Sequence, residues 1–389
     1  MMTPPTIRAA RADEAEQLTA LAMRSKAHWG YDQAFLQQCR AELTVQPAWC
    51  DAGEVFVAER NGETVGYYYA DMNWAKTEVE HLFVEPGAMG QGIGRSLVQH
   101  LMGRSEVAGA AQIVVESDPH AAPFYRSMGF GPFGDAESKS IKGRMLPRFV
   151  RFHRGRRLGG VKDATVTVDP SPWGYAAEYA DDIKAHWHVV MERQPSVFDG
   201  QVFITRSWDL NQGTLQAKVS LTQYSAFLAW RDLGYPDRTA NNLFGSAVII
   251  SRDGAILYGE MAGWTSNAGL IYPPGGSLNP SDIVSDGSVD VNASIARELH
   301  EETGLKAEDA MIDPLMITDD GPRLSAARFF GFSVDAEPLR EEILAHNARS
   351  KLPELSDVVI LRDATDIDPS RMPGYAQAIA HAHFEGDGL

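Results

Sequence analysis

Two stretches of the sequence hold residue types whose spacing could do chemistry, and the first is a run of alternate glycines. Gly90, Gly92 and Gly94 stand between a segment typical of a strand and one typical of a helix. Alternate glycines let a backbone approach an anion closely, and the free N–H groups at a helix N-terminus attract that anion. The spacing therefore predicts a pyrophosphate-binding turn, with a plain strand-to-helix turn as the alternative. A Rossmann or Walker A site is not indicated, because the residues that must accompany such glycines are missing.

The second stretch is a cluster of carboxylates, RELHEETGL at residues 297–305. At about 100° per helical residue, Glu298, Glu301 and Glu302 fall within an arc of about 100°. Like charges on one helix face repel each other unless something cationic lies among them. Mg²⁺ or Mn²⁺ fits, because hard cations prefer oxygen ligands. The pattern predicts a divalent-cation site, with a solvated acidic helix face as the alternative.

Alternating strand and helix patterns surround the glycine run and would position it. Apolar residues recur at helical spacing, and Asn61-Gly62 is typical of a tight hairpin turn. We predict strands over residues 6–10, 54–60, 63–72, 79–84 and 112–117, and helices over 12–28, 94–105 and within 121–130. The glycine run then lies where a strand ends and a helix begins.

HLFVEPGAMGQGIGRSLVQHL and ESDPHAAPFYRSMGF together resemble the GNAT superfamily of acetyl-CoA-dependent N-acetyltransferases, over about residues 5–152. The resemblance implies a mixed twisted sheet with flanking helices, acetyl-CoA as cosubstrate and a small-molecule amine as acceptor. It also implies that Tyr125 protonates the departing CoA thiolate. It implies two groups of cofactor residues, of which the first pairs with the pantetheine arm and the second binds the pyrophosphate: Leu82, Phe83 and Val84; and Gly90, Gln91, Gly92, Ile93, Gly94 and Arg95.

The substrate ammonium must lose a proton, and Glu78 and Glu80 precede the glycine run on the same predicted strand. A carboxylate can take that proton directly or through water, and we take Glu80 as the base. A solvated strand carboxylate is the alternative for both. SKAHWGYD resembles a segment of small GNAT proteins, which implies an amine pocket lined by His28, Trp29 and Tyr31. Aromatic packing at the end of a helix is the alternative for Trp29.

A second set of patterns surrounds the carboxylate helix. We predict helices over 179–194, 225–234 and 289–305, strands over 201–209, 214–222, 328–334 and 357–363, and a hairpin over 246–261. Asp253-Gly254 is the turn of that hairpin, and Gly304 ends the carboxylate helix. Residues 273–288 are predicted to be a loop that leads into the helix.

Residues 297–305 resemble the end of the Nudix box, R-E-U-x-E-E-x-G-U, where U is aliphatic. The resemblance implies an α/β/α sandwich with an extra N-terminal αββ segment that hydrolyses a nucleoside diphosphate derivative with Mg²⁺ or Mn²⁺. Glu298, Glu301 and Glu302 match the metal ligands, and we take Glu301 as the one that also orients water. Arg297 matches the arginine that braces the first ligand. The same resemblance implies a substrate loop at Gly275 and Gly276.

The front half of the box departs from the family pattern. Gly276 lies further from Arg297 than the box allows, which implies an insertion, and the first glutamate slot falls on Val289, beside Asp290. A late loop often supplies another catalytic glutamate in this family, and Glu354 is our first choice. The candidates, each with a solvated surface carboxylate as the alternative, are Glu337, Glu341, Glu342 and Glu354. The altered box leaves open a domain that senses a nucleotide without hydrolysing it.

Charge divides the 389-residue chain in two. Residues 1–157 hold 18 basic and 18 acidic side chains, so the net charge of −17 comes from the remainder. An arginine-rich run and paired glycines indicate a linker over 153–164, between domains at 1–152 and 165–389. Because the acidic part repels phosphate, binding to nucleic acid or an anionic membrane is not expected.

The whole pattern predicts a two-domain protein of α/β and α+β class that joins an acetyltransferase to a nucleotide hydrolase. Cys39 and Cys50 cannot form a disulfide framework, which favours a reducing compartment. Neither a secretory leader nor a run of apolar residues long enough to span a membrane is found, so we expect a cytoplasmic protein. The acceptor amine, the nucleotide and the oligomeric state stay open.

Overall fold

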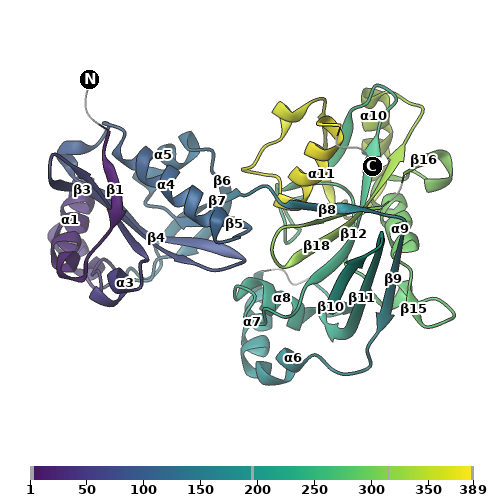
Figure 1. The fold of residues 1–389 in the computed structure, drawn as a ribbon, viewed down its shortest axis with the longest axis horizontal. Coiled ribbons are helices and arrows are strands. Elements are labelled where there is room, and N and C mark those ends of the chain that lie inside the picture. The colour runs from purple at the N-terminus through teal and green to yellow at the C-terminus, as the bar shows by residue number, and fades with distance from the viewer. Residues whose placement is uncertain (1–3, 194–196, 314, 387–389) are drawn as a thin grey trace. The chain divides into compact units, whose positions relative to one another are not determined.

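The computed structural model describes residues 4–193, 197–313 and 315–386. The chain divides into two compact units, Met1–His153 and Arg154–Leu389. In Figure 1 the first unit runs from purple to blue and the second from teal to yellow. Each unit has its own sheets and is described by itself.

A seven-stranded sheet forms the centre of the first unit, in the order β1-β2-β3-β4-β5-β7-β6. The β4–β5 pair is parallel and the other neighbours are antiparallel, so the sheet is mixed, as predicted. The Asn61-Gly62 turn is confirmed, with φ of 54° and 80° at its two residues. The strands are β1 Thr6–Ala9, β2 Val55–Arg60, β3 Glu63–Met72, β4 Lys76–Val84, β5 Gln112–Glu116, β6 Gly131–Glu137 and β7 Met145–Phe152.

Helices pack on both faces of this sheet. Successive residues of a strand point to opposite faces, so neighbouring residues of β3 show what covers each face. Tyr67 of β3 lies in one apolar cluster with Leu18 and Leu21, while its neighbour Tyr68 lies in another with Leu97. The first cluster contains residues of the helices between β1 and β2, and the second contains residues of the helix after the glycine run. The helices are α1 Ala15–Ala27, α2 Gln33–Cys39, α3 Pro47–Asp51, α4 Ile93–Val107 and α5 Ala122–Ser127.

Strand β4 contains a bulge that its sequence does not reveal. Tyr69 pairs with His81 and Ala70 with Val79, so Glu80 is the extra residue. A bulge turns the side chain at that point in a new direction and increases the local twist. The parallel pairing of β4 with β5 ends at Val79, directly before the bulge. In the described residues, the two strands therefore separate from Glu80 onward.

The second unit is built on two sheets. The larger follows the order β14-β13-β12-β18-β17-β8, and β16 and β19 pair with β18 and β13. The smaller follows the order β10-β11-β9-β15. The prediction of a sandwich with an extra αββ segment was incomplete, because β9 and β15 join the two strands of that segment in a sheet of their own. The strands are β8 Arg156–Val161, β9 Asp163–Val168, β10 Gln201–Asn211, β11 Thr214–Gln223, β12 Asn242–Ile250, β13 Ile256–Met261, β14 Ile271–Tyr272, β15 Ser288–Val289, β16 Met311–Ile312, β17 Leu315–Asp319, β18 Arg323–Gly331 and β19 Leu355–Leu361.

Helix α9, which carries the predicted carboxylates, packs against β12 of the larger sheet. A Cβ at Gly245 of β12 would lie 2.5 Å from a side-chain carbon of Ile295, so glycine lets the helix come close. The side chain of Asp290 caps the start of α9, and Gly304 ends it with φ of +77°, as predicted. The helices are α6 Gly174–Glu178, α7 Ala180–Arg193, α8 Tyr224–Asp232, α9 Val291–Thr303, α10 Ala336–Asn347 and α11 Gly374–Phe384.

The linker predicted over 153–164 is wrong. Arg156–Val161 form β8, which pairs with β17, and the following strand β9 pairs with β11. Arg156 Nη2 lies 2.6 Å from Asp319 Oδ2, so a residue of the basic run neutralises a carboxylate of its own unit. The segment predicted to be a solvated linker therefore contains the first strand of the second unit.

The helix predicted over 179–194 is described up to Arg193, and its last residue lies outside the described residues. Within the described ranges, every helix is too short or too polar to cross a bilayer.

Candidate functional site

A cavity of about 440 Å³ opens in the first unit where β4 and β5 separate. Residues Leu82–Val84 belong to the part of β4 that pairs with β3 and, in the described residues, no longer with β5. Backbone N–H and C=O groups on such an edge can bind an extended chain that carries amides. The predicted cofactor residues that line the cavity are Leu82, Phe83, Val84, Gly90, Gly92, Ile93, Gly94 and Arg95.

The glycine turn gives this cavity an end that suits an anion. Gly90 and Gly92 have φ of +73° and +82°, which a side chain would strain. Gly92 is the N-cap of the 15-residue helix α4, so the first N–H groups of that helix stand at the turn. Gly94 serves packing, because a Cβ there would lie 3.2 Å from the ring of Phe124.

Gln91 differs from its neighbours in the turn. Its Nε2 donates to the Gly87 carbonyl at 2.7 Å, and its Oε1 accepts from Arg60 Nη1 at 2.7 Å. The side chain thus holds the shape of the turn, and it is not among the residues that line the cavity.

Tyr125 lines the cavity from α5. Its ring packs against Phe130 and Phe149, with ring centroids 5.7 and 6.1 Å away, and the residue is 5% exposed. Burial raises the pKa of Tyr125 well above its ordinary value, so the phenol keeps its proton at neutral pH. A neutral phenol on the cavity wall can give a proton to an anion that forms there.

Glu80 lines the cavity from the bulge, but its charge is already balanced. Both carboxylate oxygens accept from Lys139 Nζ, at 3.0 and 2.9 Å. The other predicted base, Glu78, does not line the cavity and pairs with Lys76 at 2.7 Å. Burial acts to raise the pKa of Glu78, but the hydrogen bond and charge of Lys76 hold it below its usual value.

Glu116, at the end of β5, is a cavity residue that the sequence analysis missed. Its strand position follows the Val79–Val115 pair, so it stands next to Glu80 where the strands separate. Its nearest ion contact is Arg148 Nε at 4.0 Å. Burial raises the pKa of Glu116, and this effect outweighs the positive charges of Lys139 and Arg148, which act to lower it. Its place at the end of a predicted strand, beside the strand that carries the predicted base, could have identified it as a candidate.

The three residues expected to line the amine pocket lie in different places. Trp29 lines the cavity and stacks on His120, with ring centroids 5.2 Å apart and planes 3° apart. Tyr31 donates to Asp118 at 3.0 Å and so holds a carboxylate that lines the cavity, while burial raises the pKa of Tyr31 to about 12. His28 is exposed and meets Trp29 edge-on. His120 was missed, although it lies in the segment that carries Tyr125.

In the second unit, the predicted carboxylates of α9 lie in three different environments. Glu298 accepts from Arg297 Nη1 at 2.6 Å. Glu302 is half-buried, with its Oε2 shielded from water, and it accepts from the Gly275 N–H at 2.9 Å, while the side chain of Glu301 is 58% exposed. Burial raises the pKa of Glu298 and of Glu302.

Asp282 contacts Arg297, the residue that the resemblance implies is supported by the first glutamate of the box. Arg297 Nη2 donates to the buried Asp282 at 3.0 Å. The sequence comparison had placed that slot at Val289, beside Asp290, but Asp290 caps the helix. The insertion explains the error, because it forms a helical turn at Pro280–Asp282 and then the short strand β15.

Glu354, our first choice among the late glutamates, lies close enough that its charge raises the pKa of both Glu298 and Glu302. Gly276 lies against the same cluster, since a Cβ there would come within 2.6 Å of Glu298 Oε1. The glycine loop therefore lies against Glu298 and Glu302 of α9, and the charge of Glu354 acts on the same two carboxylates.

The same carboxylates do not form a ready metal cage. In the described part of the chain, no group of three or more His, Cys, Asp or Glu side chains is placed to hold a metal ion. Their oxygen donors suit a hard cation, and Mg²⁺ is commonly held by one or two carboxylates together with ligand phosphates and water. The divalent-cation site therefore stays a prediction.

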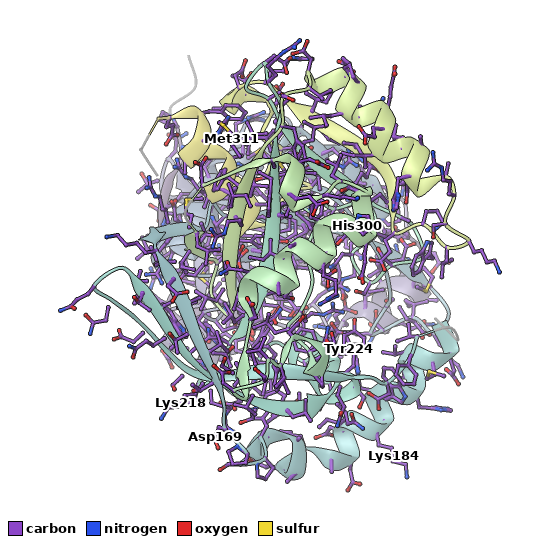
Figure 2. All side chains as sticks on the ribbon, turned by 90° about the vertical axis from the view of Figure 1, so that its right-hand side faces the viewer. Asp169, Lys184, Lys218, Tyr224, His300 and Met311 are labelled. Carbon is purple, nitrogen blue, oxygen red and sulfur yellow. The ribbon has the colours of Figure 1, made fainter. Side chains whose placement is uncertain are left out.

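A pocket of about 160 Å³ lies beside the Gly275–Gly276 loop. Tyr224 and Arg231 reach it from α8, Arg323 from β18 and Tyr375 from α11; Figure 2 labels Tyr224 on α8 and His300 on α9. Asn242 also lines it, and its Oδ1 is buried without a hydrogen-bond partner among the described residues. Aromatic rings and guanidinium groups suit a planar, anionic ligand.

Comparisons with known proteins concern the first unit. A family model described as an acetyltransferase (GNAT) domain matches residues 51–132. Peptidyl-lysine N-acetyltransferase YjaB of Salmonella typhimurium is 31% identical over 137 residues, which are 34% of this chain and 86% of that protein. IAA acetyltransferase of Azospirillum brasilense is 35% identical over 86 residues, 20% of this chain and 56% of that protein.

The chain spans 46%, 28% and 56% of the lengths of the first three curated relatives that it matches. A solved PaiA N-acetyltransferase of Thermoplasma acidophilum, in complex with coenzyme A, is 14% identical with a TM-score of 0.34. That match covers 39% of this chain and 100% of the other.

Proposed function

The chain belongs to the GNAT acetyltransferase family through its first unit, and from this membership we propose that it transfers the acetyl group of acetyl-CoA to the amino group of a small molecule. One observation carries the proposal. The cavity at the separation of β4 and β5 brings an unpaired strand edge, a helix N-terminus and Tyr125 to one place.

The parts of acetyl-CoA match the parts of this cavity. The amides of the pantetheine arm extend along Leu82–Val84, where the backbone groups of β4 face the cavity. The pyrophosphate lies at the turn around Gly92, whose N–H groups and helix dipole favour negative charge. The thioester then reaches the end of β5, between Glu116 and Tyr125.

The transfer is a direct attack of the amine on the thioester carbon. The ammonium first gives one proton to a carboxylate, and the C–N bond then forms as the C–S bond breaks. The thiolate takes the proton of Tyr125, and the second proton that the nitrogen loses restores the phenol of Tyr125. Of the carboxylates that line the cavity, Glu80 and Glu116 stand where β4 and β5 separate, and we favour Glu116 over Glu80 as the base. Lys139 already binds both oxygens of Glu80, whereas the raised pKa of Glu116 brings it nearer to that of a useful base at neutral pH.

The test is product detection. The full chain is incubated with acetyl-CoA and a pool of small primary amines, and mass spectrometry identifies any amine that gains an acetyl group. We expect at least one acetylated amine with an equal amount of free CoA. Acetyl-CoA that binds but transfers to none of the amines, or only to water, contradicts the proposal.

A second candidate function belongs to the second unit. The pocket beside Gly275–Gly276, together with the carboxylates of α9, favours a nucleoside diphosphate derivative as the ligand. Tyr224 and Tyr375 line the pocket beside Arg231 and Arg323, which pair with Asp232 and Asp320 at 2.7 Å, and Asn242 adds an acceptor. Glu298 and Glu301 would hold Mg²⁺ together with the ligand phosphates, and the cation would supply charge for phosphoanhydride cleavage.

One experiment distinguishes a hydrolase from a nucleotide sensor in the second unit. The full chain is given nucleotide sugars, dinucleotides and ADP-ribose with Mg²⁺, beside Glu301→Gln and, as control, Glu308→Gln at an exposed site. Phosphate-ester release that only Glu301→Gln abolishes supports the hydrolase. Binding without release supports a nucleotide sensor, and the absence of both binding and release contradicts both versions.

A further inference from the structure

The acceptor end of the first unit's cavity holds more carboxylates than one acetyl transfer needs. Those that line the cavity are Glu42, Glu80, Glu116 and Asp118. Lys139 lies 2.9 Å from Glu80, and Lys26 lies 3.2 Å from Asp118, so both charges are neutralised inside the protein. Glu116 faces the reacting amine in the proposed transfer. Glu42 is left with no task in that reaction.

Glu42 is held in place by its backbone, while its Oε2 has no hydrogen-bond partner among the described residues. It lies in the segment after α2, and its carbonyl accepts from His81 Nε2 at 3.0 Å. His81 Nδ1 in turn lies 3.1 Å from the hydroxyl of Tyr67, which donates to it. Burial lowers the pKa of His81 to about 4, so this ring is neutral and does not balance the carboxylate.

Glu42 Oε2 is buried and, among the described residues, receives no hydrogen bond. An unpaired carboxylate oxygen away from water is unfavourable, because it has lost hydration without gaining a donor. A cationic group brought by a ligand into the cavity that Glu42 lines would supply that donor.

Apolar side chains line the rest of this end. Leu43 follows Glu42 in the chain, and Leu146 of β7 also lines the cavity. Trp29 adds a flat wall, which His120 supports by stacking. Walls of this kind suit a methylene chain that joins two polar groups.

We propose that the acceptor carries two amino groups, one that reacts beside Glu116 and a second ammonium that pairs with Glu42, as in a diamine or polyamine. The inference rests on the proposed acetyl transfer. The first nitrogen loses a proton to Glu116 and forms the C–N bond as the C–S bond breaks. The second nitrogen stays protonated and changes no bond. A monoamine leaves Glu42 unpaired, and an amino acid brings a like charge beside it.

Three acceptors of equal chain length test the idea: 1,4-diaminobutane, butylamine and 4-aminobutanoate. CoA release is measured with each, for the wild type, Glu42→Gln and the control Glu63→Gln at an exposed position of β3. We expect kcat/KM for the diamine to exceed that for butylamine by about ten- to a hundredfold, with the amino acid lowest, since charge-assisted pairs give differences of this order. Glu42→Gln should bring the ratio of diamine to butylamine close to one, mainly through the KM of the diamine.

Equal kcat/KM for diamine and butylamine in the wild type overturns the inference, as does an unchanged ratio in Glu42→Gln. If no amine is acetylated, the proposed function fails, and calorimetry on the CoA-saturated protein then decides the inference separately. Diamine binding that is tighter than butylamine binding and is weakened in Glu42→Gln supports it, and equal binding overturns it. A thermal unfolding scan of each variant confirms that the comparison is made between folded proteins.

Discussion

Single carboxylates in this protein differ in whether a cation already balances them, and that difference decides what each can do. Glu80 is bound by Lys139 through both oxygens, whereas Glu116 meets Arg148 at 4.0 Å. In the second unit Glu302 is half-buried, accepts one backbone hydrogen bond and has its Oε2 shielded from water. Residue type alone could not separate these cases, because the partners come from distant segments. The pKa directions lead to two predictions.

Glu116 should set the acid limb of the rate profile. Because burial raises its pKa, the base is protonated and inactive at low pH, and kcat/KM rises as pH passes through a value above that of an ordinary glutamate. Glu116→Gln should lower kcat/KM about a hundredfold and remove this limb. The measurement is kcat/KM against pH with Glu80→Gln for comparison, and a limb that Glu80→Gln removes instead would assign the base to Glu80.

Glu302 should make the second unit less stable as pH rises. The pKa of Glu302 is raised in the folded state, so folding takes up a proton above the unfolded pKa of about 4.3, and the free energy of unfolding then falls with pH. Glu302→Gln removes this dependence. Thermal unfolding of the full chain between pH 5 and 8 checks it, following the transition that the mutation alters. A wild-type Tm that stays flat over this range contradicts the assignment.

Each of the two units positions its site with one feature that the period-2 and period-3.6 patterns of the sequence do not reveal. The glycine turn, the hairpin at Asn61-Gly62 and the helix stop at Gly304 were predictable, because each depends on local backbone conformation. The bulge at Glu80 was not, since it depends on pairing with β3. Nor was the role of Asp282, which reaches Arg297 through an inserted loop.

Gly92 gives a test of the turn at this scale. Gly92→Ala places a side chain at φ of +82° with nothing within 4 Å of the added Cβ, so the cost is backbone strain of about 1 kcal/mol. We expect this loss of stability together with weaker acetyl-CoA binding, as the N–H groups at the start of α4 shift. Gly87→Ala is the matched control, because its Cβ also has free space and its φ is not positive. Calorimetric titration with acetyl-CoA compares the two variants, and equal affinities would show that the turn is not part of the binding site.

The whole molecule is a chain of two units, and the boundary between them is where the sequence misled most. The shift in charge and the arginine run located the change of unit correctly to within a few residues, but they indicated a solvated linker. Residues from Arg156 onward form β8 and β9, which enter the larger and the smaller sheet. Glycine pairs and basic runs are common to linkers and to edge strands, so composition could not choose between them.

Two fragments of the second unit should behave differently as a result. A fragment that begins at Arg154 keeps β8 and its ion pair between Arg156 and Asp319, so we expect a cooperative thermal transition. A fragment that begins at residue 165 loses all of β8 and the start of β9, which exposes the edge of β17 and should cause aggregation or a much lower Tm. Equal Tm values for the two fragments would contradict this expectation and support a linker over residues 153–164.

The claim at the centre of this account is that the cavity between β4 and β5 transfers acetyl groups, with Tyr125 as the proton donor. Tyr125→Phe keeps the packed ring and removes only the hydroxyl, so CoA release with the best amine of the panel should fall about a hundredfold. The affinity for acetyl-CoA, measured on the same protein, should stay as in the wild type. Undiminished CoA release by Tyr125→Phe, with normal binding, would contradict the assignment of this residue and of the chemistry built on it.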